Sequence, residues 1–583
     1  MFKRSSRSPI AIIGSLLLLL AAVPAFGRSK PKAQPKPDDL TPEQRAAIAA
    51  ISDKVFYQEA KLCGDMHKFT PMVETYIQNL KPDQDLGDVP VSDNYFIGRL
   101  TLDERGLTNT TFTERKSGGL FNRVMDRLTD FYKMDYLPLG FMQLLVLNNK
   151  FDKDHYELQF ERREFLGDVR TMVFLVKAKP HFKGPHFVGR IYVEDQDYHI
   201  VRLNGTYEPA SRGSFFFHFD SWRMNLQPDQ WLPAYVYTEE TDTRYMMFRH
   251  LNMKGQTRLW GYDRKHSGHT DELTDIEVDQ NDQVADKTSK DMNDFSPVQS
   301  QHMWEREAED NVLDRMERAG LLAPDGDVAK VLQTVVNNIE ITNKLNIEPE
   351  VRCRVLLTTP LETFTVGHTI VISRGLLDVL PDEASLAMVL SHELAHIALG
   401  HRLDTRYSFA DRTMFPDEQS FKKLDVARDE HDETEANQKS LELLKNSPYA
   451  DKLASAELFL KMLQDRSAEL PALTDPHFGN RIAKKNELLR FGTLAQAGPQ
   501  LEQRNVQQIA ALPLGSRIKL DPWNDQVEMK EMKPVPLYSA RDKMPLEVTP
   551  FFVNLARLSP AQNQNAQAQS QAPSAAGNEQ AQK

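Results

Sequence analysis

Two histidines four residues apart, His392 and His396, stand in an apolar stretch of the chain, and Glu393 follows the first of them directly. On a helix, residues four apart lie on one face, so both imidazole rings can bind a single tetrahedral Zn²⁺ ion. Glu393 can then reach a metal-bound water molecule as a general base. The spacing predicts a zinc-dependent protease, and the alternative is a pair of surface histidines on an amphipathic helix.

The residues around this motif favour a buried helix. Pro381, Asp382 and Glu383 are typical of a helix start, and Gly400 is typical of a helix end. The apolar residues between them are Leu386, Val389, Leu390, Leu394, Ile397 and Ala398. Polar side chains buried on such a helix cost free energy unless they are bonded. The context therefore favours a metal site over surface histidines.

A zinc protease of this type needs a third protein ligand and an open fourth position for water. Candidates stand at the start of a second predicted helix, which becomes apolar further on: Glu430, Asp432, Glu433 and Glu435. A solvated acidic helix start, which the helix dipole favours, explains the same residues when they are taken alone. Spacing does not choose among the four carboxylates.

The segments His392–His396, Gly400–His401 and Glu433–Asn437 together resemble peptidase family M48, a gluzincin family. Its pattern is H-E-x-x-H followed by E-x-x-A-D on a later helix, and the resemblance extends over about 303–489. It implies one Zn²⁺ ion per chain, with Glu433 as the third ligand and Glu393 as the catalytic base. It also implies that Thr369–Leu377 contains the edge strand of the active site and the turn into its helix.

The sequence departs from the family pattern at two places. Asn437 stands where the family usually has Asp. Further on, Asp475 occupies the usual place of a His, His477 is displaced by two positions, and Arg481 keeps the place of the family's Arg. Asn437, His477 and Arg481 are therefore candidates for contacts with the ligands or with substrate.

The N-terminus predicts export. Three basic residues precede the apolar run Ile10–Val23, and small residues that fit a cleavage site follow, so residues 1–27 read as a signal peptide. The alternative is an uncleaved anchor. We expect a periplasmic or extracellular protein, without a stable transmembrane span after cleavage because no later apolar run is long enough.

Composition excludes other classes of protein. The net charge of −12 argues against a nucleic-acid binder, which needs a basic surface. Two cysteines in 583 residues exclude a disulfide scaffold. Cys63 and Cys353 fall in different predicted domains, so we expect two unpaired thiols even in an oxidising compartment.

Hydrophobic periodicity predicts a multidomain α+β protein, with a curved antiparallel β-sheet domain followed by a mainly α-helical peptidase domain. Helical pattern runs from Thr41 to about Leu80, and a further helix is expected at Phe121–Lys133. The predicted divisions are a signal peptide (1–27), a linker and N-terminal helical segment (28–93), the β domain (94–265), an acidic linker (266–297), the metallopeptidase domain (298–495), a strand and loop extension (496–558) and a disordered tail (559–583).

Within the β domain, Phe187–Glu194 followed by His199–Arg202 resembles the LolA-like lipoprotein carriers. In that fold a curved antiparallel sheet wraps a helix and can hold an acyl chain. A sheet used only for packing or for protein binding is an equal alternative.

Two functions follow from these features. The first is an exported zinc metalloendopeptidase in envelope protein quality control, with polypeptide substrates that include envelope or outer-membrane proteins. The strand around Thr363–Thr369 would bind the substrate backbone by strand addition. The alternative is a cell-envelope chaperone or a lipid- or protein-binding module with a latent or inactive metal site.

Overall fold

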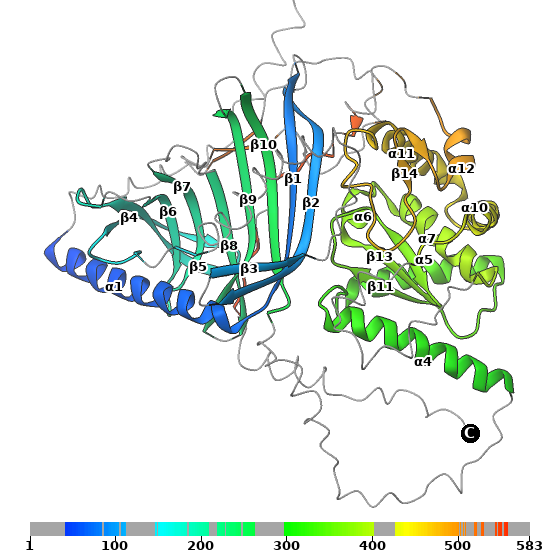
Figure 1. Cartoon of the computed structure of the whole chain (residues 1–583), viewed down its shortest axis with the longest axis horizontal. Helices are drawn as coiled ribbons and strands as arrows, with labels where there is room; N and C mark the ends of the chain where they lie inside the picture. Colours follow the sequence, from blue (N-terminus) through cyan, green and yellow to red (C-terminus); the bar gives the residue numbers. More distant parts are fainter. Residues whose placement is uncertain are drawn as a thin grey trace, which may run out of the picture.

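The computed structural model consists of a large β-sheet with one long helix and a mainly helical part with a small sheet, which lie side by side (Figure 1). This arrangement confirms the predicted α+β fold of an antiparallel sheet followed by a helical domain. The structure describes residues 41–83, 87–103, 106–111, 146–147, 150–182, 186–208, 218–227, 229–245, 249–262, 297–401, 426–500 and parts of 502–557.

The large sheet has ten strands in the order β3-β2-β1-β10-β9-β8-β7-β6-β5-β4. All neighbouring strands are antiparallel, so hairpins and the return of β10 beside β1 build the whole sheet. The strands are β1 (Met72–Asp83), β2 (Gly87–Asp103), β3 (Gly106–Thr111), β4 (Tyr156–Leu166), β5 (Val169–Ala178), β6 (His186–Glu194), β7 (Ile200–Glu208), β8 (His218–Gln227), β9 (Gln230–Tyr245) and β10 (Arg249–Trp260).

The central strands of this sheet are buried on both faces. Successive side chains of a strand point to opposite faces, so Val73 and Ile77 of β1 lie on one face and Tyr76 on the other. The first face packs against α1 (Pro42–Asp65), whose start is fixed by a capping box at Thr41. The second face shares an apolar cluster with the helical domain and with a C-terminal segment.

One prediction for this region is wrong. The helical pattern expected up to about Leu80 ends with α1 at Asp65 and a short 3₁₀ turn, and Met72–Asp83 forms β1. Because β1 is buried on both faces, it lacks the alternation of apolar and polar residues that marks a half-buried strand. The spacing of Val73, Tyr76, Ile77 and Leu80 consequently resembles a helical repeat.

Several predicted segments lie outside the described residues. They are the signal peptide, the expected helix at Phe121–Lys133, nearly all of the acidic linker and the C-terminal tail. The helices that the structure describes include none that is long and apolar enough to cross a membrane. Cys63 and Cys353 are both free thiols, as expected.

The helical domain is built around a three-stranded sheet in the order β11-β13-β12. Its strands are β11 (Arg352–Leu356), β12 (Thr363–Val366) and β13 (Thr369–Ser373), and its helices are α4 (Pro297–Arg318), α5 (Asp327–Asn343), α6 (Arg374–Val379), α7 (Glu383–Ala398), α10 (Glu430–Lys445), α11 (Leu453–Arg466) and α12 (Gly492–Ala497). Two short hairpins follow, β14 (Ala483–Lys484) with β15 (Glu487–Leu488), and β16 (Ile518–Asp521) with β17 (Gln526–Met529).

The edge strand differs from the one that the family resemblance implied. Thr369–Ser373 pairs with β11 on one side and with β12 on the other, so it is the central strand. The edge is β12, because among the described residues it pairs with β13 alone. A short hairpin turn at Gly367, which has a positive φ of 56°, joins the two strands.

Two carboxylates of the large sheet hold loops of the helical domain. Glu74 accepts hydrogen bonds from the backbone N–H and the hydroxyl of Thr359, at 2.6 and 2.9 Å. Asp93 accepts from the backbone N–H groups of Ala472 and Leu473, at 2.9 and 2.8 Å. These loops lead to β12 and to the segment beside it, so the large sheet supports the framework of that strand.

The stability of the large sheet should depend on a buried ion pair beneath α1. Glu59 binds both guanidinium nitrogens of Arg223, at 2.7 and 2.8 Å, and both residues are almost fully buried. Glu59→Ala leaves Arg223 buried without its carboxylate, which should cost about 3–5 kcal/mol. The urea midpoint of unfolding, followed by tryptophan fluorescence, should fall. Glu43→Ala, at the exposed start of the same helix, is the control, and equal midpoints in the two variants would contradict the prediction.

Candidate active site

Helix α7 carries the H-E-x-x-H motif through the middle of the helical domain. Asp382 caps its N-terminus by accepting the Ser385 N–H at 2.8 Å, and the chain leaves the helix at Gly400 in the left-handed region. Every residue of α7 from Ala384 to Ile397 is buried except Leu386. The polar side chains of the motif therefore lie inside the domain.

Helix α10 crosses beside α7 and brings Glu433 to the motif. Asp429 caps α10 by accepting the Asp432 N–H at 2.9 Å. Glu433 is buried on the face of α10 that also carries Ala436, Ser440 and Leu444, whereas Glu430 and Glu435 are exposed. Among the four candidate carboxylates, Glu433 is the one that the structure places against His392 and His396.

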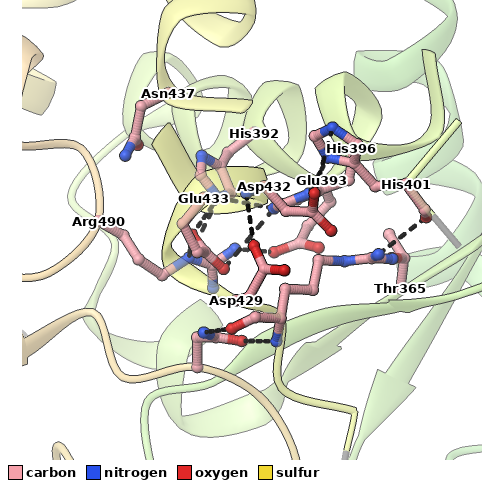
Figure 2. A network of polar contacts seen from close by, with 12 residues as sticks. Thr365, His392, Glu393, His396, His401, Asp429, Asp432, Glu433, Asn437 and Arg490 are labelled. Carbon is pink, nitrogen blue, oxygen red and sulfur yellow. Dashed lines mark hydrogen bonds and ion pairs between the residues drawn. The ribbon is translucent and has the colours of Figure 1, made fainter. Parts of the chain in front are cut away.

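The two imidazoles and this carboxylate converge (Figure 2). Nε2 of His392 lies 3.2 Å from Nε2 of His396 and 3.1 Å from Oε2 of Glu433. Nε2 of His396 lies 3.7 Å from Oε1 of Glu433. All three groups are buried, and their donor atoms lie within 4.8 Å of one another. Such a set can hold one metal ion.

A buried arginine, Arg490, joins these groups to Glu393. Its Nε–H donates to Nε2 of His392 and to Oε2 of Glu433, both at 3.1 Å. One terminal nitrogen pairs with Oε1 of Glu393, and the other donates to the carbonyl oxygen of Thr363 at 3.1 Å. The guanidinium therefore contacts two carboxylates, one imidazole and strand β12.

The electrostatics of the cluster suit metal ligands. Burial lowers the pKa values of His392 and His396, and the charge of Arg490 lowers that of His392 further. Burial alone would raise the pKa of Glu433, but the positive charge of Arg490 opposes it and helps hold this pKa at about 2. Two neutral imidazoles and one carboxylate are the protonation states in which these groups bind metals.

The donor set fits a zinc ion, which takes imidazole nitrogens and a carboxylate oxygen with one position left for water. One feature is unusual, because the buried Nδ1 of His392 has no hydrogen-bond partner among the described residues. Metal-binding histidines usually donate this second N–H to an acceptor. The lone pairs of His392 and Glu433 that accept from Arg490 are also the ones that a metal would take, so Arg490 Nε–H and a metal compete for them.

Asn437 is linked to the donor set through Phe491. Its side-chain oxygen accepts the backbone N–H of Phe491 at 2.8 Å. The ring of Phe491 packs on His392 with a centroid distance of 4.7 Å. Asn437 therefore fixes the segment that carries Arg490 and Phe491.

The other two candidates lie apart from the metal-capable group. Arg481 forms an ion pair with Asp475 and contacts none of the three donor residues in the interactions that the structure shows for it. His477 packs edge-on against Phe478, with ring centroids 4.5 Å apart, and its backbone N–H donates to Glu362 at 3.0 Å. The arginine that reaches the site is Arg490, nine residues later.

A second group of residues supports His396 from the outside. Nδ1 of His401 lies 2.9 Å from Nδ1 of His396, and Nε2 of His401 lies 3.3 Å from the Glu435 carboxylate. Arg428 donates to the His401 carbonyl at 2.8 Å and to the Thr365 hydroxyl at 2.5 Å. Glu435 therefore contacts the donor set only by way of His401 in the interactions that the structure shows for it.

Neighbouring segments pack against the edge of β12 that does not pair with β13. All four of its residues are buried. The carbonyl of Phe478 accepts the Val426 N–H at 3.2 Å, and Gly479 lies so close that an added Cβ would sit 2.9 Å from the Thr363 oxygen. A side chain at 479 would press on the edge strand, so glycine is required for this close approach.

Fold and site together define a metallopeptidase domain with ligands on two neighbouring helices. Residues 325–469 match the model of Peptidase family M48, which confirms the family inferred from the motifs for this segment. The matched segment contains His392, Glu393, His396 and Glu433 but not Arg490. No curated protein matches the chain.

The buried carboxyl of Glu362 holds the segment beside β12, and its titration should make the free energy of unfolding depend on pH. Burial raises the pKa of Glu362 to about 7, although its Oε2 accepts from the His477 and Phe478 N–H groups. A raised folded-state pKa means that the stabilisation is complete below about pH 4.5 and is lost as pH rises through about 7.

Glu362→Gln stays neutral at every pH and should remove this dependence. Relative to the variant, the wild type should lose on the order of 3 kcal/mol of unfolding free energy between pH 4 and 8. Urea unfolding at several pH values measures the difference. Parallel curves for the two proteins would show that Glu362 does not titrate in this range.

Proposed function

We propose that this protein is an exported zinc metalloendopeptidase. Zinc would be held by His392, His396 and Glu433, with Glu393 as the catalytic residue. The observation that carries the proposal is the convergence of two buried imidazoles and one carboxylate from α7 and α10 beside a second buried carboxylate. When bound, zinc supplies a Lewis acid that polarises the scissile carbonyl and acidifies a water molecule.

The residues of the chain would perform the proton transfers. Glu393 takes the proton of the attacking water on its carboxylate and later delivers it to the leaving amine. Its Oε1 is occupied by Arg490, so the proton would be taken on Oε2. Arg490 holds the carboxylate in place and supplies positive charge next to the reacting atoms.

Substrate binding would use the small sheet. Strand β12 lies between the donor set and the segment 475–480, and its Thr363 carbonyl and Thr365 hydroxyl now bond to Arg490 and Arg428. An extended substrate could pair with this edge once those contacts yield. The N-terminal sequence supports action outside the cytoplasm, on envelope polypeptides, and fractionation of cells tests that location.

Substrate cleavage should depend on Glu393, whereas metal binding should not. In purified protein, Glu393→Gln should keep one zinc ion per chain, because Glu393 is not in the donor set, and should lose casein cleavage by a factor of about 10²–10⁴. His392→Ala should lose both. Metal analysis and a casein assay on the same samples measure the two effects. Zinc without Glu393-dependent cleavage would support the alternative of a binding module with an inactive metal site.

The third ligand can be tested against its close neighbour. Glu433→Gln removes the only buried carboxylate in the donor set and should reduce bound zinc strongly. Glu435→Gln changes an exposed residue that reaches His396 only through His401, so it should retain most of the metal. Equal metal loss in the two variants, or loss in Glu435→Gln alone, would contradict the assignment of Glu433.

A further inference from the structure

The described residues of a C-terminal segment, 543–544, 546–550 and 553–557, lie on the face of the large sheet opposite α1. We call this segment the strap. Its described apolar side chains join the cluster formed by the aromatic residues of that face, and they are Met544, Leu546, Val548 and Leu555. The strap residues that the structure describes form no strand of the sheet, and the sequence has prolines at 545 and 550, which disfavour such pairing. Side chains and single backbone groups therefore hold it.

A buried glutamine binds the backbone of the strap. Gln78 of β1 is fully buried, its Nε2 donates to the Leu546 carbonyl at 2.7 Å, and its Oε1 accepts the Val548 N–H at 2.8 Å. This pair of bonds imitates the ladder of a neighbouring strand. Any extended peptide offers the same two groups, whatever its side chains.

A buried lysine, Lys254, binds the side chain of Glu547, which stands between Leu546 and Val548. Lys254 stands directly opposite Gln78 in the β1–β10 register, and only 1% of its side chain is exposed. It forms an ion pair with Glu547 and lies 3.9 Å from Glu239. A buried ammonium group needs a carboxylate nearby. The site consequently selects an acidic residue flanked by two apolar ones.

The other end of the strap packs closely against a glycine, Gly167. Gly167, in the β4–β5 turn, has a positive φ, and an added Cβ would lie 2.6 Å from backbone atoms of Leu555. The Asp168 N–H donates to the Leu555 carbonyl at 2.8 Å. Arg557 then pairs with the buried Glu194. This end thus selects a basic residue.

The spacing of the two ends fits one extended chain. β1 and β5 are six strand spacings apart in the sheet order, or about 29 Å. The eight residue steps from 547 to 555 span about 27 Å when extended, which suffices on a curved sheet. A cavity of about 630 Å³ remains beside Arg557, bordered by Phe165 and Arg170.

We propose that this face of the large sheet is a binding site for extended polypeptides, and that the strap is its occupant in cis. The partner in trans is an unfolded segment with an acidic residue between apolar residues and a basic residue about ten positions later. The buried charges on this face, which include the Arg202–Asp220 pair at 2.7 Å, favour a peptide over an acyl chain. Binding here does not depend on the proposed peptidase activity.

The test uses the full chain and a fluorescent peptide with the strap sequence, KMPLEVTPFFVNLAR. The chain carries Glu393→Gln so that the probe is not cleaved. In this background Glu547→Lys places a cation against Lys254 and should release the strap. Fluorescence anisotropy should then show probe binding at least about tenfold tighter than to the chain with an intact strap, which competes at high effective concentration.

Matched controls identify the site. A probe with Lys in place of its Glu should not bind, and adding Gln78→Leu to the Glu547→Lys chain should abolish binding. If Glu547→Lys does not fold, as judged by circular dichroism and thermal melting, the uncharged double change Leu546→Ser with Val548→Ser replaces it. The proposal is overturned if the released chain folds but binds the probe no better, if oleate but not unlabelled peptide displaces the probe, or if neither strap variant folds, since the strap is then part of the core.

Discussion

Two carboxylates and two imidazoles meet inside the helical domain, and the guanidinium of Arg490 is the positive group that contacts three of them directly. It donates to His392, Glu433 and Glu393 and also to the backbone of β12. Unpaired carboxylates in such surroundings would cost several kcal/mol or take up protons. Arg490 keeps Glu433 ionised, which is visible in the depressed pKa of that carboxyl. The ligand geometry therefore depends on a residue that lies beyond the segment shared with the family.

The large sheet supports this arrangement from outside. Glu74 holds the loop before β12, and Asp93 holds the loop before the segment 475–480. Leu361 also donates its N–H to the Leu473 carbonyl at 2.8 Å, so the two loops are bonded to each other. Because the two carboxylates lie on β1 and β2, these strands and the loops beside β12 belong to one hydrogen-bonded framework. The sheet domain is in this sense part of the peptidase.

Much of the site could be predicted because it rests on local spacing. A spacing of four positions on α7 places His392 and His396 on the same face of the helix. The ends of this helix, at Asp382 and Gly400, follow from residue type. Choosing Glu433 needed the family pattern, since the helical spacing alone left four carboxylates open. The role of Arg490 could not be predicted, because no sequence pattern around it indicates that its side chain contacts His392 and Glu393, almost a hundred residues earlier. β1 was misread because burial on both faces removes the strand periodicity. β13 was taken for the edge strand because strand order is a tertiary property.

The contacts of Arg490 also indicate how one residue can serve both the resting site and the catalytic one. Only its Nε–H uses the lone pairs of His392 and Glu433 that a metal ion would take. Its two terminal nitrogens bond to Glu393 and to the Thr363 carbonyl, which are outside the donor set. A metal can therefore replace the first contact without disturbing the other two, and the Thr363 contact would yield only when a substrate pairs with β12. The guanidinium would then still orient the Glu393 carboxylate. A lysine, with a single nitrogen, could not divide its contacts in this way.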